Sequence, residues 1–128
     1  MNNEQLVRRL FELFGRRELD QAVALFAEAA EFQVPGSSAI SGTYQGRAGV
    51  IEFWRRQIDL SGGSFRTRVV SIRQVGDDVV VDVDISAVLD GEPISWGRTV
   101  TYRISDGLIV HASYVEADQA LADRVFST

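Results

Sequence analysis

Three charged side chains near the end of the chain could do chemistry together: Arg98, Glu116 and Asp118. Arg98 interrupts a strand pattern whose other inward positions are apolar, so its guanidinium must find a partner inside the protein. One expectation is that Arg98 holds a carboxylate, enolate or carbonyl oxygen of a ligand. The alternative is a diagonal cross-strand ion pair with Glu116.

Glu116 and Asp118 are the acids that the pattern places near the open end of the same inner face. Either carboxylate could act as a general base if apolar neighbours such as Trp96 and Tyr114 made it more basic. Each also has a structural alternative. Asp118 directly precedes a helical pattern and could cap that helix, and Glu116 could simply pair with Arg98.

Five aromatic side chains with a polar group could line a binding pocket: Tyr44, Trp54, Trp96, Tyr102 and Tyr114. Aromatic residues at this spacing usually belong to the core, but five that converge on one cavity would exceed what packing needs. We expect Trp96 and Tyr114 to line the pocket and Tyr102, deeper in its strand, to belong to the core.

The single histidine, His111, is an obvious candidate for a general base. Its odd position in the last strand points it to the outer face, away from the pocket, where it would meet solvent or a partner subunit. Asp82 and Asp84 share that outer face, and we expect them to pair with Arg103 or to face solvent.

The elements that must position these residues begin with three helices. Apolar spacing predicts a first helix that ends at Gly15, a second from Glu18 to Ala29, and a third over residues 47–60. A short strand over residues 31–34 stops at Pro35-Gly36, and residues 37–46 read as a loop.

The rest of the chain reads as four long strands and a final short helix after Asp118, cut by turn signals at residues 76–78, 90–93 and 105–107. Odd residues of 79–89 and even residues of 94–104 face inward. If residues 105–107 form a three-residue turn, Leu108, Val110, Ala112, Tyr114 and Glu116 continue the inner face. This register sets Arg98 beside Ile85 and Tyr114.

The composition excludes several classes of function. The 128 residues suit one domain over 1–128, and the net charge of −5 argues against a nucleic-acid partner. The lack of cysteine and the single histidine leave too few ligands for the usual zinc or iron sites, so we expect no metal or other cofactor. With no signal peptide and no apolar run long enough for a membrane span, we expect a cytoplasmic protein without a membrane partner.

Several segments carry a family resemblance: Phe32-Gln33-Val34-Pro35-Gly36, Ser41-Gly42-Thr43-Tyr44-Gln45-Gly46-Arg47 and Tyr102-Arg103-Ile104-Ser105-Asp106-Gly107. The chain resembles, over essentially its whole length, the SnoaL-like branch of the nuclear transport factor 2-like, or ketosteroid isomerase-like, superfamily. The resemblance implies an α+β fold in which a cone-shaped, curved antiparallel sheet wraps around N-terminal helices, also described as a cystatin-like roll.

The same resemblance speaks against a standard ketosteroid isomerase. Steroid isomerases of this superfamily place their base where Val34 stands, their oxyanion tyrosine near Leu10 and their protonated acid near Val100, so all three polar groups are missing. Epoxide hydrolases would place an acid near Ser113. Polyketide cyclases use an acid on or after the last strand, which Asp118 or Glu116 could supply.

Two classes of function follow from these residues. The first is a cofactor-free enzyme of the polyketide cyclase, isomerase or dehydratase kind, acting by acid–base chemistry on a hydrophobic carbonyl compound, with Arg98, Glu116 and Asp118 as catalytic residues. The second is a non-catalytic binding or accessory domain. In both, the small molecule would contact Phe32, Val34, Tyr44, Trp54, Trp96, Val100 and Tyr114.

We also expect a homodimer through the outer face of the sheet, which mixes Val80, Val88, Ile109 and Val115 with polar residues.

Overall fold

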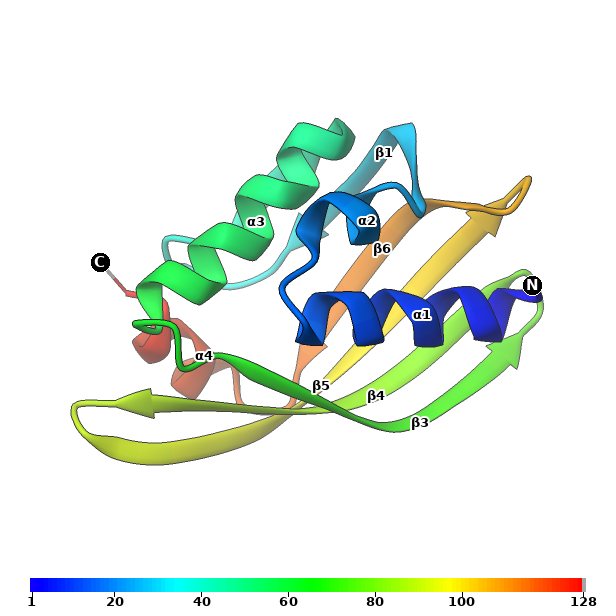
Figure 1. The fold of residues 1–128 in the computed structure, drawn as a ribbon. Helices are drawn as coiled ribbons and strands as arrows, with labels where there is room; N and C mark the ends of the chain where they lie inside the picture. The colour runs from blue at the N-terminus through cyan, green and yellow to red at the C-terminus, as the bar shows by residue number, and fades with distance from the viewer. Residues whose placement is uncertain (128) are drawn as a thin grey trace.

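The structure, a computed structural model, describes residues 1–127 as four helices and one six-stranded sheet (Figure 1). The helices are α1 (Asn3–Gly15), α2 (Leu19–Val23), α3 (Gly46–Leu60) and α4 (Gln119–Val125). The strands are β1 (Phe26–Val34), β2 (Gly42–Gln45), β3 (Arg66–Val75), β4 (Asp78–Leu89), β5 (Glu92–Ser105) and β6 (Leu108–Glu116). No helix within residues 1–127 has the length and apolar character needed to cross a membrane.

The sheet is curved, open and covered on one side by helices. Its strands run in the order β2-β1-β6-β5-β4-β3, and every neighbouring pair is antiparallel except β1 with β6. The expected α+β class with a curved sheet is therefore confirmed, and the parallel β1–β6 pair makes the sheet mixed. Helix α1 packs on β3 and β4, while α3 packs on β1 and β2 (Figure 1).

The predicted alternation of the long strands decides which side chains enter the core. In β4 the odd residues Val79 to Ala87 are buried, and in β5 the even residues Trp96 to Ile104 are buried, Arg98 among them. Because side chains alternate across a strand, the even residues of β4 and the odd residues of β5 lie on the opposite side. Together with His111, Ser113 and Val115, which pair with odd residues of β5, they form what we call the outer sheet face.

The second predicted helix is too long. It ends at Val23, and the strand predicted over residues 31–34 already begins at Phe26. An alanine-rich segment favours helix locally, but here the backbone pairs with the last strand, beginning with Ile109 N–H donating to Leu25 C=O at 2.9 Å. The predicted loop over residues 37–46 likewise contains the short strand β2.

The predicted register between the last strands is also wrong. Both hairpin loops have two residues, since Leu89 pairs with Glu92 and Ser105 with Leu108. Asp90, Gly91, Asp106 and Gly107 all have positive φ, as a type I′ turn requires. The tighter β4–β5 loop places Arg98 opposite Val83 rather than Ile85. The tighter β5–β6 loop, together with one extra residue in β6, places it opposite Glu116 rather than Tyr114.

A β-bulge in β6 explains why His111 still faces outward. Arg103 pairs with His111 but Ile104 pairs with Ile109, so Val110 is an extra residue that restores the alternation. Ala112 and Tyr114 are buried as predicted. Before the bulge the parity is reversed, so Ile109, predicted on the outer face, is fully buried, whereas Leu108 and Val110 are only half-buried.

Helix α4 closes one end of the cone. Phe126, directly after it, is fully buried, with its ring against Phe65 and Trp96 at centroid distances of 5.9 and 6.1 Å. Its carbonyl also accepts a hydrogen bond from Ala39 N–H at 3.1 Å. Phe126 is therefore part of the core and anchors the end of α4 to it.

Candidate functional site

A small cavity lies between α1, α3 and the inner face of the sheet. Its volume is about 30 Å³, and its walls are mostly apolar side chains of α1, α3, β4 and β5. Six of its lining residues are polar or carry a polar group, namely Trp54, Gln57, Thr67, Arg98, Tyr102 and Tyr114. Only Phe11 and Thr67 of the lining are not fully buried, so the mouth of this inner cavity lies between α1 and β3.

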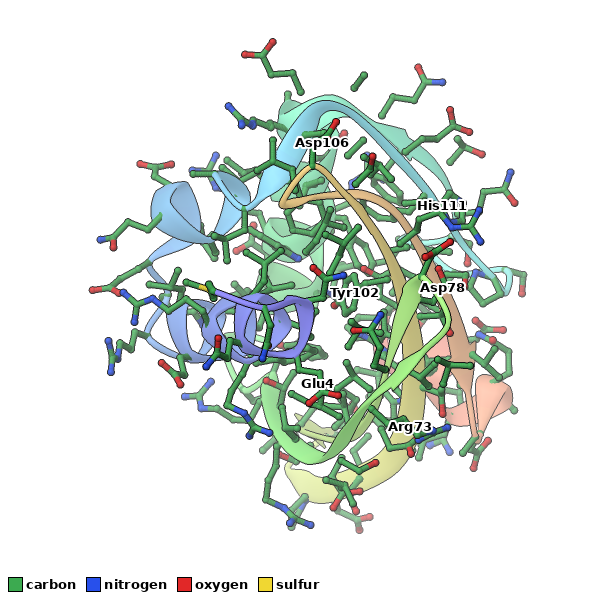
Figure 2. The ribbon with its side chains drawn as sticks, turned by 90° about the vertical axis from the view of Figure 1, so that its right-hand side faces the viewer. Glu4, Arg73, Asp78, Tyr102, Asp106 and His111 are labelled. Atoms are coloured by element: carbon green, nitrogen blue, oxygen red, sulfur yellow. The ribbon has the colours of Figure 1, made fainter. Side chains whose placement is uncertain are left out.

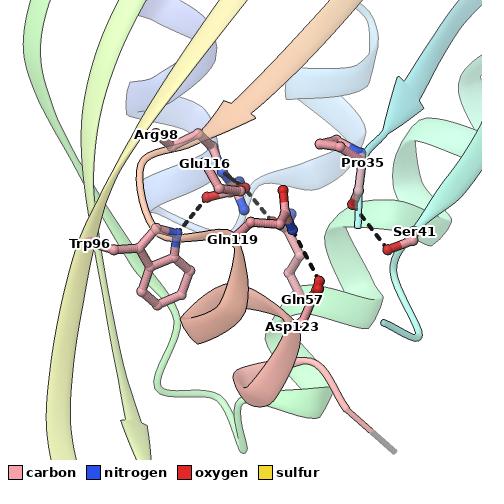
Figure 3. A network of polar contacts seen from close by, with 8 residues as sticks. All are labelled: Pro35, Ser41, Gln57, Trp96, Arg98, Glu116, Gln119 and Asp123. Atoms are coloured by element: carbon pink, nitrogen blue, oxygen red, sulfur yellow. Dashed lines mark hydrogen bonds and ion pairs between the residues drawn. The ribbon is translucent and has the colours of Figure 1, made fainter. Parts of the chain in front are cut away.

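Arg98 is the centre of a buried polar network beside the inner cavity (Figure 3). Its Nε donates to Glu116 Oε1 at 2.7 Å, and its Nη1 donates to Gln57 Oε1 at 2.8 Å. Trp96 Nε1 donates to the other oxygen of Glu116. The Arg98 and Glu116 side chains are only 5% and 3% exposed, so this is a buried ion pair with good hydrogen-bond geometry.

The third nitrogen of the guanidinium, Arg98 Nη2, has no partner. It is buried and makes no hydrogen bond with any group in residues 1–127. The rings of Phe65 and Tyr114 lie on the guanidinium at 5.7 Å, so aromatic faces stabilise its charge but supply no acceptor. A buried donor without an acceptor is unfavourable, and an oxygen atom in the inner cavity would relieve that penalty.

Two tyrosines provide further hydroxyl groups on the same side. Tyr102 and Tyr114 line the inner cavity, and burial raises the pKa of the Tyr102 hydroxyl well above its ordinary value of 10.0. Burial also raises the pKa of Tyr114, although the nearby Arg98 charge opposes the shift. Both hydroxyls therefore remain protonated at neutral pH and can donate hydrogen bonds.

The candidate general bases lie outside the inner cavity. Glu116 sits behind Arg98, and each of its oxygens already accepts a hydrogen bond. Asp118 is exposed and caps α4, with Oδ1 accepting from Leu121 N–H at 3.0 Å. Neither carboxylate borders the space that a ligand would occupy.

His111 lies on the outer sheet face and is exposed, as the parity of its strand predicted. Figure 2 shows it, like Asp78, on the side of the sheet opposite Tyr102. Arg103 pairs there with Asp78 at 3.1 Å, whereas Asp82 and Asp84 pair with Arg73 and Arg68. The expected partner of Asp82 and Asp84, Arg103, is therefore engaged elsewhere.

Only part of the predicted lining reaches the inner cavity. Trp54, Val100 and Tyr114 line it, and so does Tyr102, which we expected in the core. Phe32 and Tyr44 stack at 5.2 Å, and the Tyr44 hydroxyl donates to Ile40 C=O, so these rings fill the space between β1, β2 and α3.

Two further predicted contacts also lie elsewhere. Val34 is buried at the end of β1, where it pairs with Gly42 of β2. Trp96 lies beyond Arg98, in contact with Phe126 and Glu116. The corrected register pairs Trp96 with Ile85 and places it beyond the end of β6, on the side where α4 follows.

Gln57 is the member of the Arg98 network that sequence reasoning missed. It is 2% exposed on the inner face of α3, where its side chain fixes Arg98. The signal was present, because residues 50, 53, 54 and 57 follow the spacing of one helical face and Gln57 is the polar member of that set.

No cluster of His, Asp or Glu side chains within residues 1–127 has the arrangement of a metal site. The charged group of the inner cavity is the guanidinium of Arg98, a hydrogen-bond donor that suits the oxygen of an organic ligand.

Comparisons with known proteins agree on the family and the fold. Residues 7–112 match the SnoaL-like domain family. A solved structure from Xanthomonas campestris with a cystatin-like fold is 22% identical, with all of both chains covered and a TM-score of 0.91. An NTF2-like protein from Burkholderia pseudomallei is 23% identical, again with both chains fully covered, at a TM-score of 0.85.

A third solved structure comes from Sinorhizobium meliloti and is described as a candidate polyketide cyclase. It is 19% identical, the match covers 87% of this chain and 94% of that one, and the TM-score is 0.68. No curated protein matches the chain in sequence. At these identities the solved structures establish the shared fold, and function must be argued from the site itself.

Proposed function

The chain belongs to the SnoaL-like domain family, within the NTF2-like and ketosteroid isomerase-like superfamily, and we propose that it binds a small hydrophobic carbonyl compound and activates it. The ligand oxygen would accept hydrogen bonds from Arg98 Nη2 and from a tyrosine hydroxyl in the inner cavity. The observation that carries the proposal is that Arg98, which lines this cavity, has a buried Nη2 with no hydrogen-bond partner in residues 1–127.

The chemistry in this proposal is electrophilic. Negative charge develops on a carbonyl oxygen when the compound enolises or when its carbon is attacked, and donors fixed in a dry site stabilise that charge. No carboxylate of residues 1–127 lines the inner cavity, so the proton lost from the compound would pass to a solvent water or hydroxide ion at the mouth between α1 and β3. Activation of this kind fits cyclase or isomerase chemistry, and the Sinorhizobium meliloti neighbour is described as a candidate polyketide cyclase.

A non-catalytic binding domain is the second candidate. It is favoured by the same absence of a carboxylate in the lining of the inner cavity and by the engagement of both Glu116 oxygens. A site that holds an oxygen firmly but offers no proton acceptor would bind without turnover. In both candidates the ligand must enter past Phe11, because this side chain lies at the mouth of the inner cavity.

One experiment tests the proposal and separates the two candidates. Cyclohexanone, a small ketone, is incubated with the protein in D2O, and exchange of its α-protons is followed by NMR. We expect the protein to accelerate exchange and Arg98→Met to remove most of the acceleration, by about 100-fold if the donor acts on the enolate oxygen. His111→Ala, on the outer sheet face, is the matched control and should retain it.

Binding of the ketone without faster exchange would support the non-catalytic candidate. Acceleration that survives Arg98→Met but disappears in His111→Ala would refute the proposed site.

A further inference from the structure

The charge of Arg98 is already neutralised inside the protein. Its Nε and Glu116 Oε1 are 2.7 Å apart, and both side chains are almost completely buried. Arg98 is also the only charged residue in the lining of the inner cavity, as far as residues 1–127 show. The site therefore presents a free N–H donor, Nη2, on a pair of groups whose charges cancel.

The other polar neighbours do not add positive charge. Gln57 is neutral and uses its oxygen to accept from Nη1, while burial keeps Tyr102 and Tyr114 protonated. The remaining walls are apolar, so charges there are weakly screened. A carboxylate placed at Nη2 would add a buried negative charge close to Glu116 with no second cation to compensate it.

A neutral carbonyl group meets the same donor without that penalty. Its oxygen satisfies Nη2 and brings no net charge into the apolar walls. We infer that Glu116 sets the charge preference of the inner cavity: by neutralising Arg98 it selects ligands that offer a neutral carbonyl and rejects those that offer a carboxylate. This inference rests on the proposed function and narrows its substrate class.

Acetophenone and benzoate are suitable probes because they share the ring and the planar shape and differ mainly in charge. Binding of each is measured by calorimetry at pH 7 to the native protein, Glu116→Gln and Arg98→Met/Glu116→Met. Each protein is also prepared with Phe11→Ala, which widens the mouth of the inner cavity without touching the Arg98 network. The amide of Glu116→Gln can still accept from Arg98 Nε but leaves the guanidinium charge uncompensated.

We expect the native protein to prefer acetophenone by about tenfold or more, and Glu116→Gln to reverse the preference by a similar factor, since one buried charge is enough to do so. Arg98→Met/Glu116→Met should bind both probes weakly. Should Glu116→Gln not fold, Glu116→Asp, which retracts the carboxylate from Arg98, should move the preference in the same direction by a smaller factor.

Three results would overturn the inference. If the native protein binds benzoate with the same affinity as acetophenone, Glu116 does not set the preference, although the binding site itself stands. The same holds if the Glu116 variants leave the ratio of the two affinities unchanged. If neither probe binds any of these proteins, even with Phe11→Ala, the proposed function fails together with the inference.

Discussion

Arg98 uses its three nitrogens in three different ways. Nε pairs with Glu116, Nη1 is fixed by Gln57, and Nη2 is left without a partner beside the inner cavity. The first two contacts hold the guanidinium plane in place, so the third nitrogen has a defined direction before any ligand arrives. The sequence offered an ion pair and a ligand contact as alternatives for this residue. The structure shows the ion pair and leaves one nitrogen available for the proposed contact.

Removing Arg98 alone should destabilise the fold more than removing the whole pair. Arg98→Met leaves the Glu116 carboxylate buried with only Trp96 as donor, which should cost ~3 kcal/mol or more. Arg98→Met/Glu116→Met removes both charges and should recover most of that loss. Urea unfolding of the two variants measures the difference, and equal loss in both would show that an unpaired Glu116 carboxylate does not destabilise the fold.

Tyr102 and Tyr114 should make the fold sensitive to alkaline pH. Their pKa values are raised in the folded state, so the unfolded chain loses these protons first, above about pH 10.0. The stabilising contribution of the two tyrosines is therefore fully present below pH 10.0. As pH rises from there towards their pKa values in the folded state, the free energy of unfolding falls by about 1.4 kcal/mol per pH unit for each tyrosine.

The sequence contains no lysine, so tyrosines dominate the titration in this range. Urea midpoints from pH 8 to 11.5 test the expectation, with Tyr102→Phe/Tyr114→Phe as the comparison. An equally steep alkaline loss in that double variant would contradict it.

At the scale of elements, α4 should contribute to stability as a core element. Phe126 is fully buried between Phe65 and Trp96, so Phe126→Ala should cost about 3–5 kcal/mol. Leu121→Ala, at a half-buried position within α4, is the control and should cost clearly less. Thermal unfolding followed by circular dichroism compares them, and similar small losses would mean that α4 is only loosely attached.

The elements also show what the sequence could and could not predict. The alternation of apolar and polar residues in β4 and β5 identified their buried faces. Shifting the assignment by one residue would turn every apolar side chain to solvent, so only one assignment is favourable. The pairing between strands was not predictable in the same way. It depends on loop length and on the bulge at Val110, and neither changes which residue types alternate.

The candidate site depended on the features that were harder to predict. Arg98 and Glu116 were recognised from residue type, yet their direct pairing required both the two-residue β5–β6 loop and the bulge at Val110. Gln57 lies 41 residues away from Arg98 in the chain, so only the packing of α3 on the sheet brings the two together. The aromatic residues were assigned to one pocket by type, whereas packing divides them between the inner cavity and the core.

At the scale of the whole molecule, we predict a homodimer through the outer sheet face. Val88 and Val115 are 48% and 65% exposed there, among half-buried threonines and paired charges, a composition that suits a self-complementary interface. Sedimentation equilibrium at micromolar concentration should show a dimer, and Val115→Arg should shift it towards monomer. A native protein that sediments only as monomer would rule out this interface at those concentrations.

The central claim is that Arg98 Nη2 donates to a ligand carbonyl in the inner cavity, and the infrared stretch of that carbonyl tests it most directly. Acetophenone bound to the native protein, or to the Phe11→Ala variant, should show its C=O band at lower frequency than when bound to the same protein carrying Arg98→Met/Glu116→Met. A hydrogen bond from a guanidinium weakens the C=O bond, whereas an apolar cavity does not. Bound acetophenone with the same C=O frequency in both proteins would contradict the claim.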